Sequence, residues 1–337
     1  FSDALNSWVL LILLFVSSLT MFMSGLIANY EYDLKKIIAL STLSQLGLML
    51  SVLALGESML AFFHLLMHAL FKALLFMCAG CIIHNMNNCQ DIRYMGSLVS
   101  FIPLTSSFFN ICNLSLCGLP FLSGFYSKDL ILEFMSMSYV NFYIYFIFYI
   151  STGLTVMYSM RLVYYTMFGD NNSLSYLSIL DSSDKMLKGM GGLILLVIFG
   201  GSIMSWLVFP TPYFICLPFF MKLMVLFTVF LGGVLGFMIS NINFNDLSKT
   251  LGFYNLSFFF SSMWNLNYLS TFGTSYYFLN MGEKFYSLID QGWSEYYGSQ
   301  NMFYSIKNSS IFIEKIFMNN IKIFLTLFLI WVCLLFF

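Results

Sequence analysis

Charged residues are scarce in this chain of 337 residues. Asp, Glu, Lys and Arg make up 9% of it, whereas soluble domains average about 25%. So few charges cannot cover a water-facing surface, which excludes a soluble globular protein and a disordered tail. Fourteen basic residues against fifteen acidic ones leave no net field to attract polyanions, so we expect no nucleic-acid partner.

Cysteine is also sparse, and its seven residues are too scattered for a disulfide scaffold. Cys78 and Cys81 form a C-x-x-C pair. An iron–sulfur cluster needs four ligands, and no second pair lies at a matching spacing. Phosphate loops, nucleotide fingerprints and nucleophile–base arrangements are also missing from the sequence. We therefore predict that these thiols pack as small hydrophobic side chains, and that the chain binds neither a metal nor a cofactor of its own.

Hydrophobic residues make up 60% of the chain. They gather in about eight stretches that approach or exceed the ~20 apolar residues of a spanning helix. These lie near 8–29, 34–55, 59–83, 99–134, 139–167, 189–209, 219–240 and 317–337. Lys and Arg occur in the first, third and fifth connections and after the seventh stretch, which is the positive-inside pattern. The sequence predicts an all-α, polytopic bundle of transmembrane helices.

The fourth stretch is too long for one span. A single helix over 103–134 would measure about 48 Å, against a hydrocarbon core of ~30 Å. Two glycines and a proline interrupt its middle, so we predict a broken helix with an unwound centre near 117–124. Interrupted helices mark ion pathways in transporters. A Gly-Pro kink that serves helix packing alone is the alternative.

Residues 241–308 are too polar to span a membrane and too apolar for a free loop. Phe285, Leu288, Ile289 and Trp293 recur at a spacing of three to four residues, while the nearby charges lie off that stripe. This pattern predicts a long amphipathic helix, or a pair of helices, along a protein or membrane surface.

Ionisable side chains inside the spans are the candidate functional residues, because each costs about 3 kcal/mol on insertion scales. His64, His68 and Lys72 repeat every four residues, which places them in one stripe about 12 Å long. Histidine titrates near neutrality, and a lysine buried without a counter-charge can release its proton there, so the stripe suits a proton relay. A zinc site, for which no neighbouring Glu or Cys ligand exists, and structural hydrogen bonding between helices are the alternatives.

Four further basic residues border the spans. Lys128 lies in the second half of the predicted broken helix, where a gating or terminal proton site competes with snorkelling to the interface. Lys35 precedes a polar face formed by residues 41–45, so relay and anchoring both remain open for it. For Lys36 and Arg161 we predict interfacial anchoring.

Several runs of sequence together resemble a known family. Residues 33–47, 64–76, 90–96 and 118–129 are similar to motifs of the antiporter-like subunits of respiratory complex I. The run G-L-P-F-L-S-G-F-Y-S-K-D, and the long amphipathic segment before a last span, resemble the chain 5 family of NADH–ubiquinone oxidoreductase, of an invertebrate mitochondrial type.

The resemblance implies a particular domain order. Residues 1–170 would form the second of two inverted five-helix repeats, 171–245 two further spans, 246–316 a lateral amphipathic helix on the matrix side, and 317–337 a terminal span. The family's first repeat, with its glutamate–lysine pair, is not among these residues. We expect it in a longer polypeptide, or else a pared-down subunit that lacks it.

The resemblance also implies a function. His64, His68 and Lys72 would relay protons along the central axis, Lys128 would be the lysine nearest the exit, and Lys35 a weaker candidate. The chain would couple quinone reduction to proton pumping in the mitochondrial inner membrane. A subunit of a multisubunit sodium/proton antiporter and a truncated structural or assembly subunit are the alternatives.

The partners implied by the resemblance are the other membrane-arm subunits of complex I, especially the adjacent antiporter-like subunits that the lateral helix would brace. Those and the remaining subunits would hold NADH, FMN, the iron–sulfur clusters and ubiquinone, since this chain carries no redox centre. Membrane lipids such as cardiolipin can bind as well.

Overall fold

The structure is a computed structural model that describes residues 4–137, 142–173, 179–181, 184–242, 253–319 and 321–336. Every regular element in these ranges is a helix, and one isolated antiparallel bridge joins Asp33 to Asp91. The prediction of an all-α, polytopic membrane protein is confirmed. The chain divides into two compact units, Phe1–Trp264 and Asn265–Phe337.

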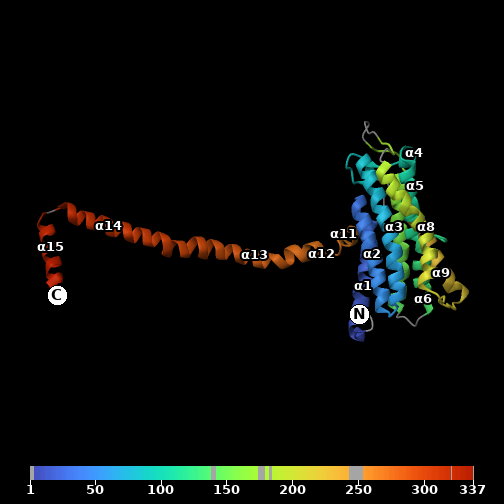
Figure 1. Cartoon of the computed structure of the whole chain (residues 1–337), viewed down its shortest axis with the longest axis horizontal. Helices are drawn as coiled ribbons and strands as arrows, with labels where there is room; N and C mark the ends of the chain where they lie inside the picture. Colours follow the sequence, from blue (N-terminus) through green and yellow to red (C-terminus); the bar gives the residue numbers. More distant parts are fainter. Residues whose placement is uncertain are drawn as a thin grey trace. The chain divides into compact units, whose positions relative to one another are not determined.

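The first unit is a bundle in which long helices lie side by side (Figure 1). Its longer helices are α1 (Ser7–Ala28), α2 (Leu34–Ala54), α3 (Ser58–Asn85), α5 (Pro103–Cys117), α6 (Leu130–Met137), α7 (Phe142–Val163), α8 (Asp184–Val208) and α9 (Phe219–Ser240). Shorter elements are η2 (Ile92–Tyr94), α4 (Leu98–Phe101), η3 (Phe125–Asp129), η4 (Tyr164–Phe168) and α11 (Tyr254–Ser261). Within the described ranges, six helices are long and apolar enough to cross a membrane, namely α1, α2, α3, α7 with η4, α8 and α9.

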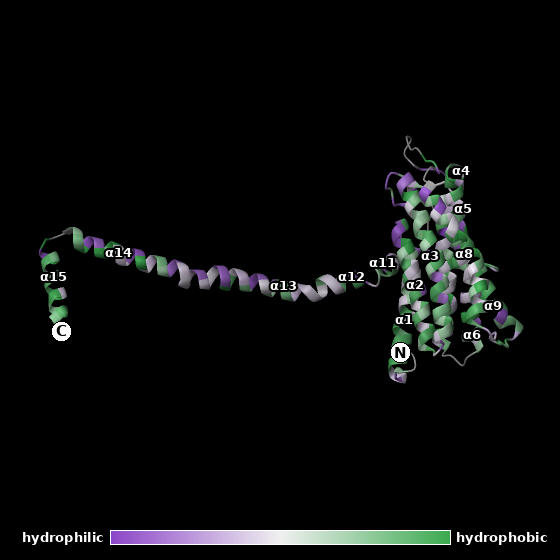
Figure 2. Ribbon diagram, in the orientation of Figure 1, coloured by the Kyte–Doolittle hydropathy of each residue, from purple (hydrophilic) through white to green (hydrophobic). Residues whose placement is uncertain are grey.

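Apolar side chains cover the outer faces of this bundle. On α8 and α9 the large exposed residues include Leu195, Phe199, Trp206, Phe227 and Phe230. Hydropathy colouring shows the same apolar flanks, with hydrophilic residues gathered toward the end of the bundle that carries α4 (Figure 2). Helices whose backbone groups are paired internally and whose outer faces are apolar suit a lipid environment.

The fourth predicted stretch folds as two half-helices. The first half, α5, ends at Cys117, and Gly118 follows in the left-handed conformation with φ of +84°. Phe121 also has a positive φ, of 70°, before the chain resumes as η3, a π-helical turn, and continues into α6. The interruption lies in the part of the sequence for which an unwound centre is predicted.

Two glycines allow close approach to this broken segment. A Cβ atom at Gly124 would lie 1.7 Å from the carbonyl oxygen of Ser115 on α5. A Cβ atom at Gly201 of α8 would lie 2.6 Å from the Cα of Ser123. Any side chain at either glycine would force the backbone apart, so the broken segment is held between its own first half and α8.

The apolar core of the bundle consists of two clusters. The first cluster includes Ile38 of α2 and Tyr158 of α7. The second includes Leu48 of α2 and Phe148 of α7. We call the buried polar side chains between the clusters the polar layer. It consists of Ser41, Ser44, Gln45, His64, Ser123, Ser127, Lys128, Ser151, Thr152 and Thr155.

The second unit is helical throughout its described residues. It comprises α12 (Leu266–Tyr268), η5 (Leu269–Gly273), α13 (Thr274–Phe285), η6 (Tyr286–Ser294), η7 (Tyr296–Gln300), α14 (Asn301–Asn319) and α15 (Ile321–Phe336). The elements η5, η6 and η7 are π-helical. Residues 243–252, the start of the predicted lateral segment, lie outside the described residues.

All described side chains of the second unit are at least partly exposed. Leu288 and Trp293, members of the predicted apolar stripe, each expose 60% of their surface. The predicted terminal span corresponds to α15, which has 16 residues and a strongly apolar sequence. So much exposed apolar surface within the unit indicates that it packs against a further apolar surface, of protein or of lipid.

Candidate functional site

The predicted stripe lies on one buried face of α3. His64, His68 and Lys72 are all buried, and the ring centroids of the two histidines are 6.3 Å apart. The face packs against α2 and α5, whose contacts with α3 are among the most extensive of the bundle. The four-residue spacing therefore brings three titratable groups into the interior.

His64 bridges two elements of the polar layer. Its Nδ1 lies 2.9 Å from the hydroxyl of Ser127 in η3, and its Nε2 lies 3.2 Å from Oε1 of Gln45 on α2. With one proton on Nε2, the ring donates to Gln45 and accepts from Ser127. With two protons it donates to both. The same partners therefore accommodate the neutral and the charged ring.

His68 differs from its neighbour one turn earlier. Its Nε2 is buried and lacks a hydrogen-bond partner within the described part of the chain. Its ring packs edge-on against Phe71, with centroids 5.3 Å apart. A buried nitrogen without a partner is costly, so this ring is available for a new hydrogen bond.

Lys72 joins the polar layer through α2. Its ammonium donates to the hydroxyl of Ser41 and to the carbonyl of Ile38, at 3.4 Å for the latter. Ser41 in turn donates to the same carbonyl at 2.7 Å. These partners of Lys72 are neutral, and the ion pairs found among the described residues involve only Lys36 and Arg93 as cations.

Lys128 lies in the π-helical turn, directly after Ser127. Its ammonium donates to the Thr155 hydroxyl of α7 at 2.8 Å and to the Leu116 carbonyl at 3.4 Å. The turn thus presents one residue to α3 and the next to α7. Lys128, Asp129 and Val225 line part of a cavity of about 10 Å³. Such a volume is enough for about one water molecule.

Lys35 lies apart from this row. It is exposed at the start of α2, whereas Ser41, Ser44 and Gln45 are buried further along the helix. Lys36 is also exposed, and it forms an ion pair with Asp33 at 2.7 Å. The structure therefore brings together His64, His68, Lys72 and Lys128 in the interior of the bundle, but it leaves Lys35 at the surface.

Arg161 differs from the prediction of an interfacial anchor, because its side chain is buried. One guanidinium nitrogen donates to the carbonyls of Asn29 at 2.6 Å, Glu31 at 2.9 Å and Ala28 at 3.4 Å. The last carbonyls of a helix have no partner within it, so Arg161 caps the end of α1. Its guanidinium also stacks on the ring of Tyr32, 4.6 Å from the centroid.

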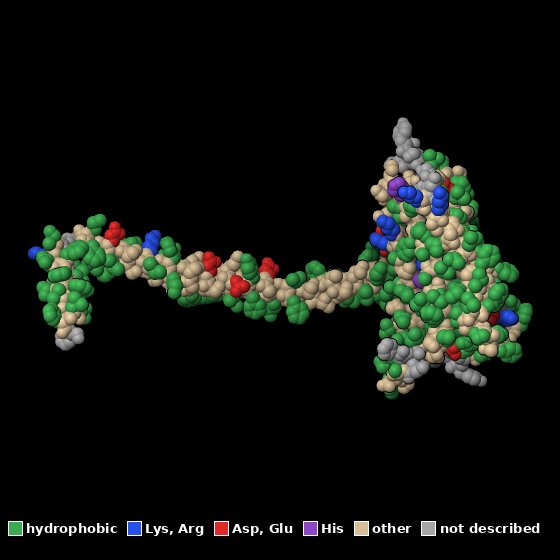
Figure 3. Space-filling view, in the orientation of Figure 1, with side chains coloured by type: hydrophobic (Ala, Val, Ile, Leu, Met, Phe, Trp, Pro, Cys, Tyr) green, Lys and Arg blue, Asp and Glu red, His purple; other side chains and the backbone are tan. Residues whose placement is uncertain are grey.

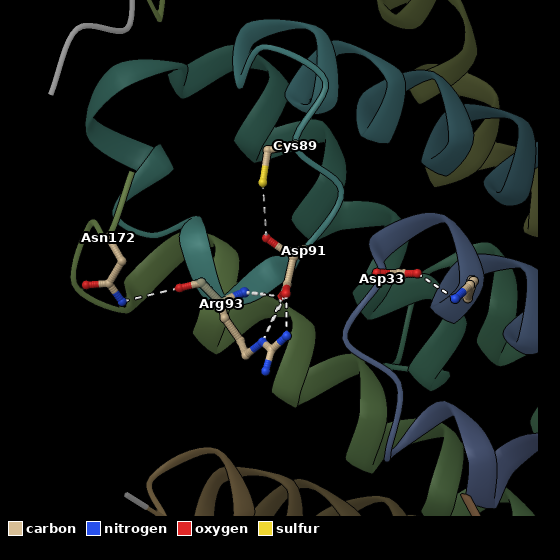
Figure 4. Close-up of polar contacts among 6 residues, drawn as sticks. Asp33, Cys89, Asp91, Arg93 and Asn172 are labelled. Carbon is tan, nitrogen blue, oxygen red and sulfur yellow. Dashed lines mark hydrogen bonds and ion pairs between the residues drawn. The ribbon is translucent and has the colours of Figure 1, made fainter. Parts of the chain in front are cut away.

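A second arginine stacks on the same ring. Arg93 lies 4.4 Å from the Tyr32 centroid and binds both carboxylate oxygens of Asp91, one of them at 2.5 Å (Figure 4). The Arg93 side chain donates to Asp91 and holds the pKa of that carboxyl below its usual range. Asn172 fixes the same loop by donating to the Arg93 carbonyl at 3.3 Å. Lys and Arg side chains gather at this end of the bundle (Figure 3).

Thr155, the partner of Lys128 on α7, was not among the site residues predicted from the sequence. Thr155 belongs to a buried run, Ser151–Thr155–Ser159, with the same four-residue spacing as the stripe of α3. That repeat was a usable signal, since polar residues spaced by one turn share a helix face.

The described residues contain no group of three or more His, Cys, Asp or Glu that could hold a metal ion. Cys78 and Cys81 instead contact Met190 and Met186.

Comparison with known proteins identifies the family. A family model described as NADH dehydrogenase subunit 5 C-terminus matches residues 158–337, and one described as NADH:quinone oxidoreductase/Mrp antiporter, TM, matches residues 1–155. NADH-ubiquinone oxidoreductase chain 5 of Anopheles quadrimaculatus is 54% identical over 324 residues, covering 96% of this chain and 56% of its own length.

Other curated relatives carry the same name. The protein of Aedes aegypti is 55% identical over 96% of this chain and 56% of its own length. That of Lumbricus terrestris is 36% identical over 94% of this chain and 54% of its own length. The chain thus spans about half the length of the curated relatives it matches. Since one family model covers more than half of the residues, the chain belongs to the NADH dehydrogenase subunit 5 family.

Proposed function

We propose that this chain is a proton-translocating subunit in the membrane arm of NADH:ubiquinone oxidoreductase, in the mitochondrial inner membrane. The observation that carries the proposal is the buried group of His64, His68, Lys72 and Lys128, where each lysine is hydrogen-bonded to a hydroxyl and not to a carboxylate. The names of the curated relatives supply the reaction of the whole complex.

Hydroxyl partners suit a group that gains and loses a proton. A serine or threonine hydroxyl accepts from an ammonium and can donate to the amine that remains after the proton leaves. Ser41 can serve Lys72 in both states, and Thr155 can serve Lys128 in the same way. A carboxylate partner would instead hold the proton by its charge.

The order of contacts gives a path. Lys72 is followed one turn away by His68, and His68 by His64 at 6.3 Å between rings. His64 contacts Ser127, which precedes Lys128. A proton that leaves one nitrogen can be taken up by the next, and each group returns to its original form when the following proton arrives. The small cavity beside Lys128 supports the proposal that this lysine is the last group of the path.

Electron transfer takes place elsewhere in this proposal. NADH, FMN, the iron–sulfur clusters and ubiquinone would be held by other subunits, and the adjacent membrane-arm subunits would contact the exposed apolar stripe of the second unit. Cardiolipin and other lipids would cover the outer faces of α8 and α9. One alternative, a subunit of a sodium/proton antiporter, agrees with the family model that matches residues 1–155, because its description names both NADH:quinone oxidoreductase and the Mrp antiporter. The family model that matches residues 158–337 is described as NADH dehydrogenase subunit 5, and it favours the respiratory complex.

The test replaces Lys128 by Ala in the intact complex. Proton pumping per electron should be abolished, while NADH:ubiquinone turnover persists, slowed or partly intact. Lys36→Ala, at an exposed residue of α2, is the matched control and should pump normally. Unchanged pumping in Lys128→Ala would remove this lysine from the path.

A further inference from the structure

Tyr158 of α7 contains a buried hydroxyl that the proposed path does not use. It is one of the largest fully buried side chains, and its hydroxyl has no hydrogen-bond partner within the described ranges. Leaving such a buried group without a hydrogen bond destabilises the fold. A group retained at that cost is a candidate for a bond that forms in another state of the protein.

The neighbours of this hydroxyl are the partners of the relay. It faces Ser41, Ser44 and Gln45 on α2 and the Cys117 thiol of α5. Ser41 accepts from Lys72, and Gln45 is the residue that contacts Nε2 of His64. The Tyr158 hydroxyl is thus a neighbour both of the hydrogen-bond partner of Lys72 and of that of His64.

The current bonds on α2 leave room for one more donor. Ser41 donates to the Ile38 carbonyl at 2.7 Å, and Ser44 donates to the Ser41 carbonyl at 2.9 Å. An sp² oxygen such as Oε1 of Gln45 can accept two hydrogen bonds. A small shift of the Tyr158 side chain would let its hydroxyl donate either to Ser41 or to Gln45.

We propose that Tyr158 is a positioning residue that couples the protonation state of Lys72 to the hydrogen bonds of His64. This inference rests on the proposed function and names a regulator of the same path. When Lys72 is charged it donates to Ser41, and Tyr158 donates to Gln45. When Lys72 has lost its proton, Tyr158 turns to Ser41 and leaves Gln45 to His64.

Through this exchange, a proton on Lys72 disfavours a proton on Nε2 of His64. While Tyr158 occupies Gln45, that oxygen holds the proton on Nε2 of His64 less strongly, because two donors share it. Release of the proton by Lys72 frees the oxygen and favours a proton on His64. The tyrosine keeps its own proton throughout, so no covalent bond of Tyr158 changes.

The test compares two tyrosines of the same helix. Tyr158→Phe removes only the hydroxyl and keeps the ring in its apolar cluster. Tyr149→Phe is the matched control, because Tyr149 is also buried on α7 and its hydroxyl has no partner among the described residues, but it lies in the other cluster. Both variants would be measured in the intact complex for turnover, pumping per electron and the pH dependence of pumping.

We expect Tyr158→Phe to keep its turnover, to lose about fivefold in pumping per electron, the effect of one hydrogen bond, and to pump with a shifted pH profile. Tyr149→Phe should match the unmodified complex. If Tyr158 had a purely structural role, its loss would lower electron turnover and proton pumping together and leave the pH profile of pumping unchanged. Identical pH profiles in the two variants would overturn the inference.

Two further variants complete the test. Gln45→Leu removes the acceptor, so it should shift the pH profile as Tyr158→Phe does, and the double variant should add nothing. This comparison also replaces the single variant if Tyr158→Phe does not assemble. Lys72→Ala separates the two proposals. If Lys72→Ala pumps normally, the proposed function fails. If Lys72→Ala abolishes pumping while Tyr158→Phe and Gln45→Leu pump normally, only the role of Tyr158 fails.

Discussion

Arg161 on α7 and Lys72 on α3 are both buried cations, and their surroundings differ in kind. Arg161 donates to three main-chain carbonyls and stacks on Tyr32. Lys72 donates to the hydroxyl of Ser41 and, at 3.4 Å, to the carbonyl of Ile38. Carbonyls only accept, and a guanidinium does not lose its proton in proteins, so the arginine site is built for a permanent charge.

Burial of a cation is therefore not enough to suggest that it gains and loses a proton. What separates the two sites is whether the partner can reverse the direction of its hydrogen bond. Lys128 with Thr155 belongs with Lys72 by this criterion, and His64 does so through Ser127. The arginine site closes the end of α1, whereas the hydroxyl partners of the lysines suit a charge that is gained and lost, as the proposed function requires.

The largest effect is expected at the arginine site. Arg161→Met removes the donor to the buried carbonyl of Ala28 and to the half-buried carbonyls of Asn29 and Glu31, and a buried acceptor left unpaired costs about 1–3 kcal/mol. We expect a loss of at least about 3 kcal/mol and little assembled complex. Assembly on native gels and thermal unfolding of the purified complex would measure it.

Arg161→Lys is the control, because it restores the charge without the planar fork and should recover only part of the stability. Normal assembly of the methionine variant would show that the carbonyls find other donors, and the structural assignment of Arg161 would be lost.

An intermediate effect, confined to function, is expected for Lys72→Met. Replacing a buried charge by an apolar side chain of similar volume is often neutral or stabilising, so we expect stability unchanged or higher by about 1 kcal/mol. Pumping should be lost, while the hydroxyl of Ser41 still bonds to Ile38. Thermal unfolding and pumping measured on one preparation would test this. A variant as unstable as Arg161→Met would erase the distinction between the sites.

The smallest effect is expected at the loop that carries Arg93. Hydrogen bonding to Arg93 lowers the pKa of Asp91, so the pair stabilises the fold above the ordinary carboxyl pKa of about 4 and loses this effect as pH falls through the lowered value. Because Arg93 is largely exposed, the contribution should stay below about 1 kcal/mol.

Asp91→Asn should therefore unfold at a slightly lower temperature than the unmodified protein at pH 7, and the difference should shrink toward pH 3. A gap that grows on acidification would contradict the sign of this linkage. A gap of several kcal/mol at pH 7 would show that the loop is as strongly coupled as the arginine site.

The sequence predicted those features that depend on spacing along one helix. The spans, the interruption near 117–124 and the stripe of His64, His68 and Lys72 follow from hydrophobic runs, glycine and proline, and a four-residue repeat. The family resemblance is confirmed by the comparisons. The roles of the individual site residues stay predictions.

Features that depend on how helices are rotated against one another were not predicted. The pairing of Lys128 with Thr155 requires α7 to turn that face toward the broken helix, and no pattern within either segment fixes that rotation. The inward direction of Arg161 depends on where α1 ends. In both cases a partner far away in the chain decides the role of the residue.

The π-helical turn Phe125–Asp129 has an evolutionary consequence. Consecutive residues of a helix differ by about 100° in direction, and here Ser127 points to α3 while Lys128 points to α7. Deleting one residue would restore ordinary helical winding and turn Lys128 away from Thr155. We therefore expect descendants of this sequence to keep the length of the turn, together with Ser127 and Lys128.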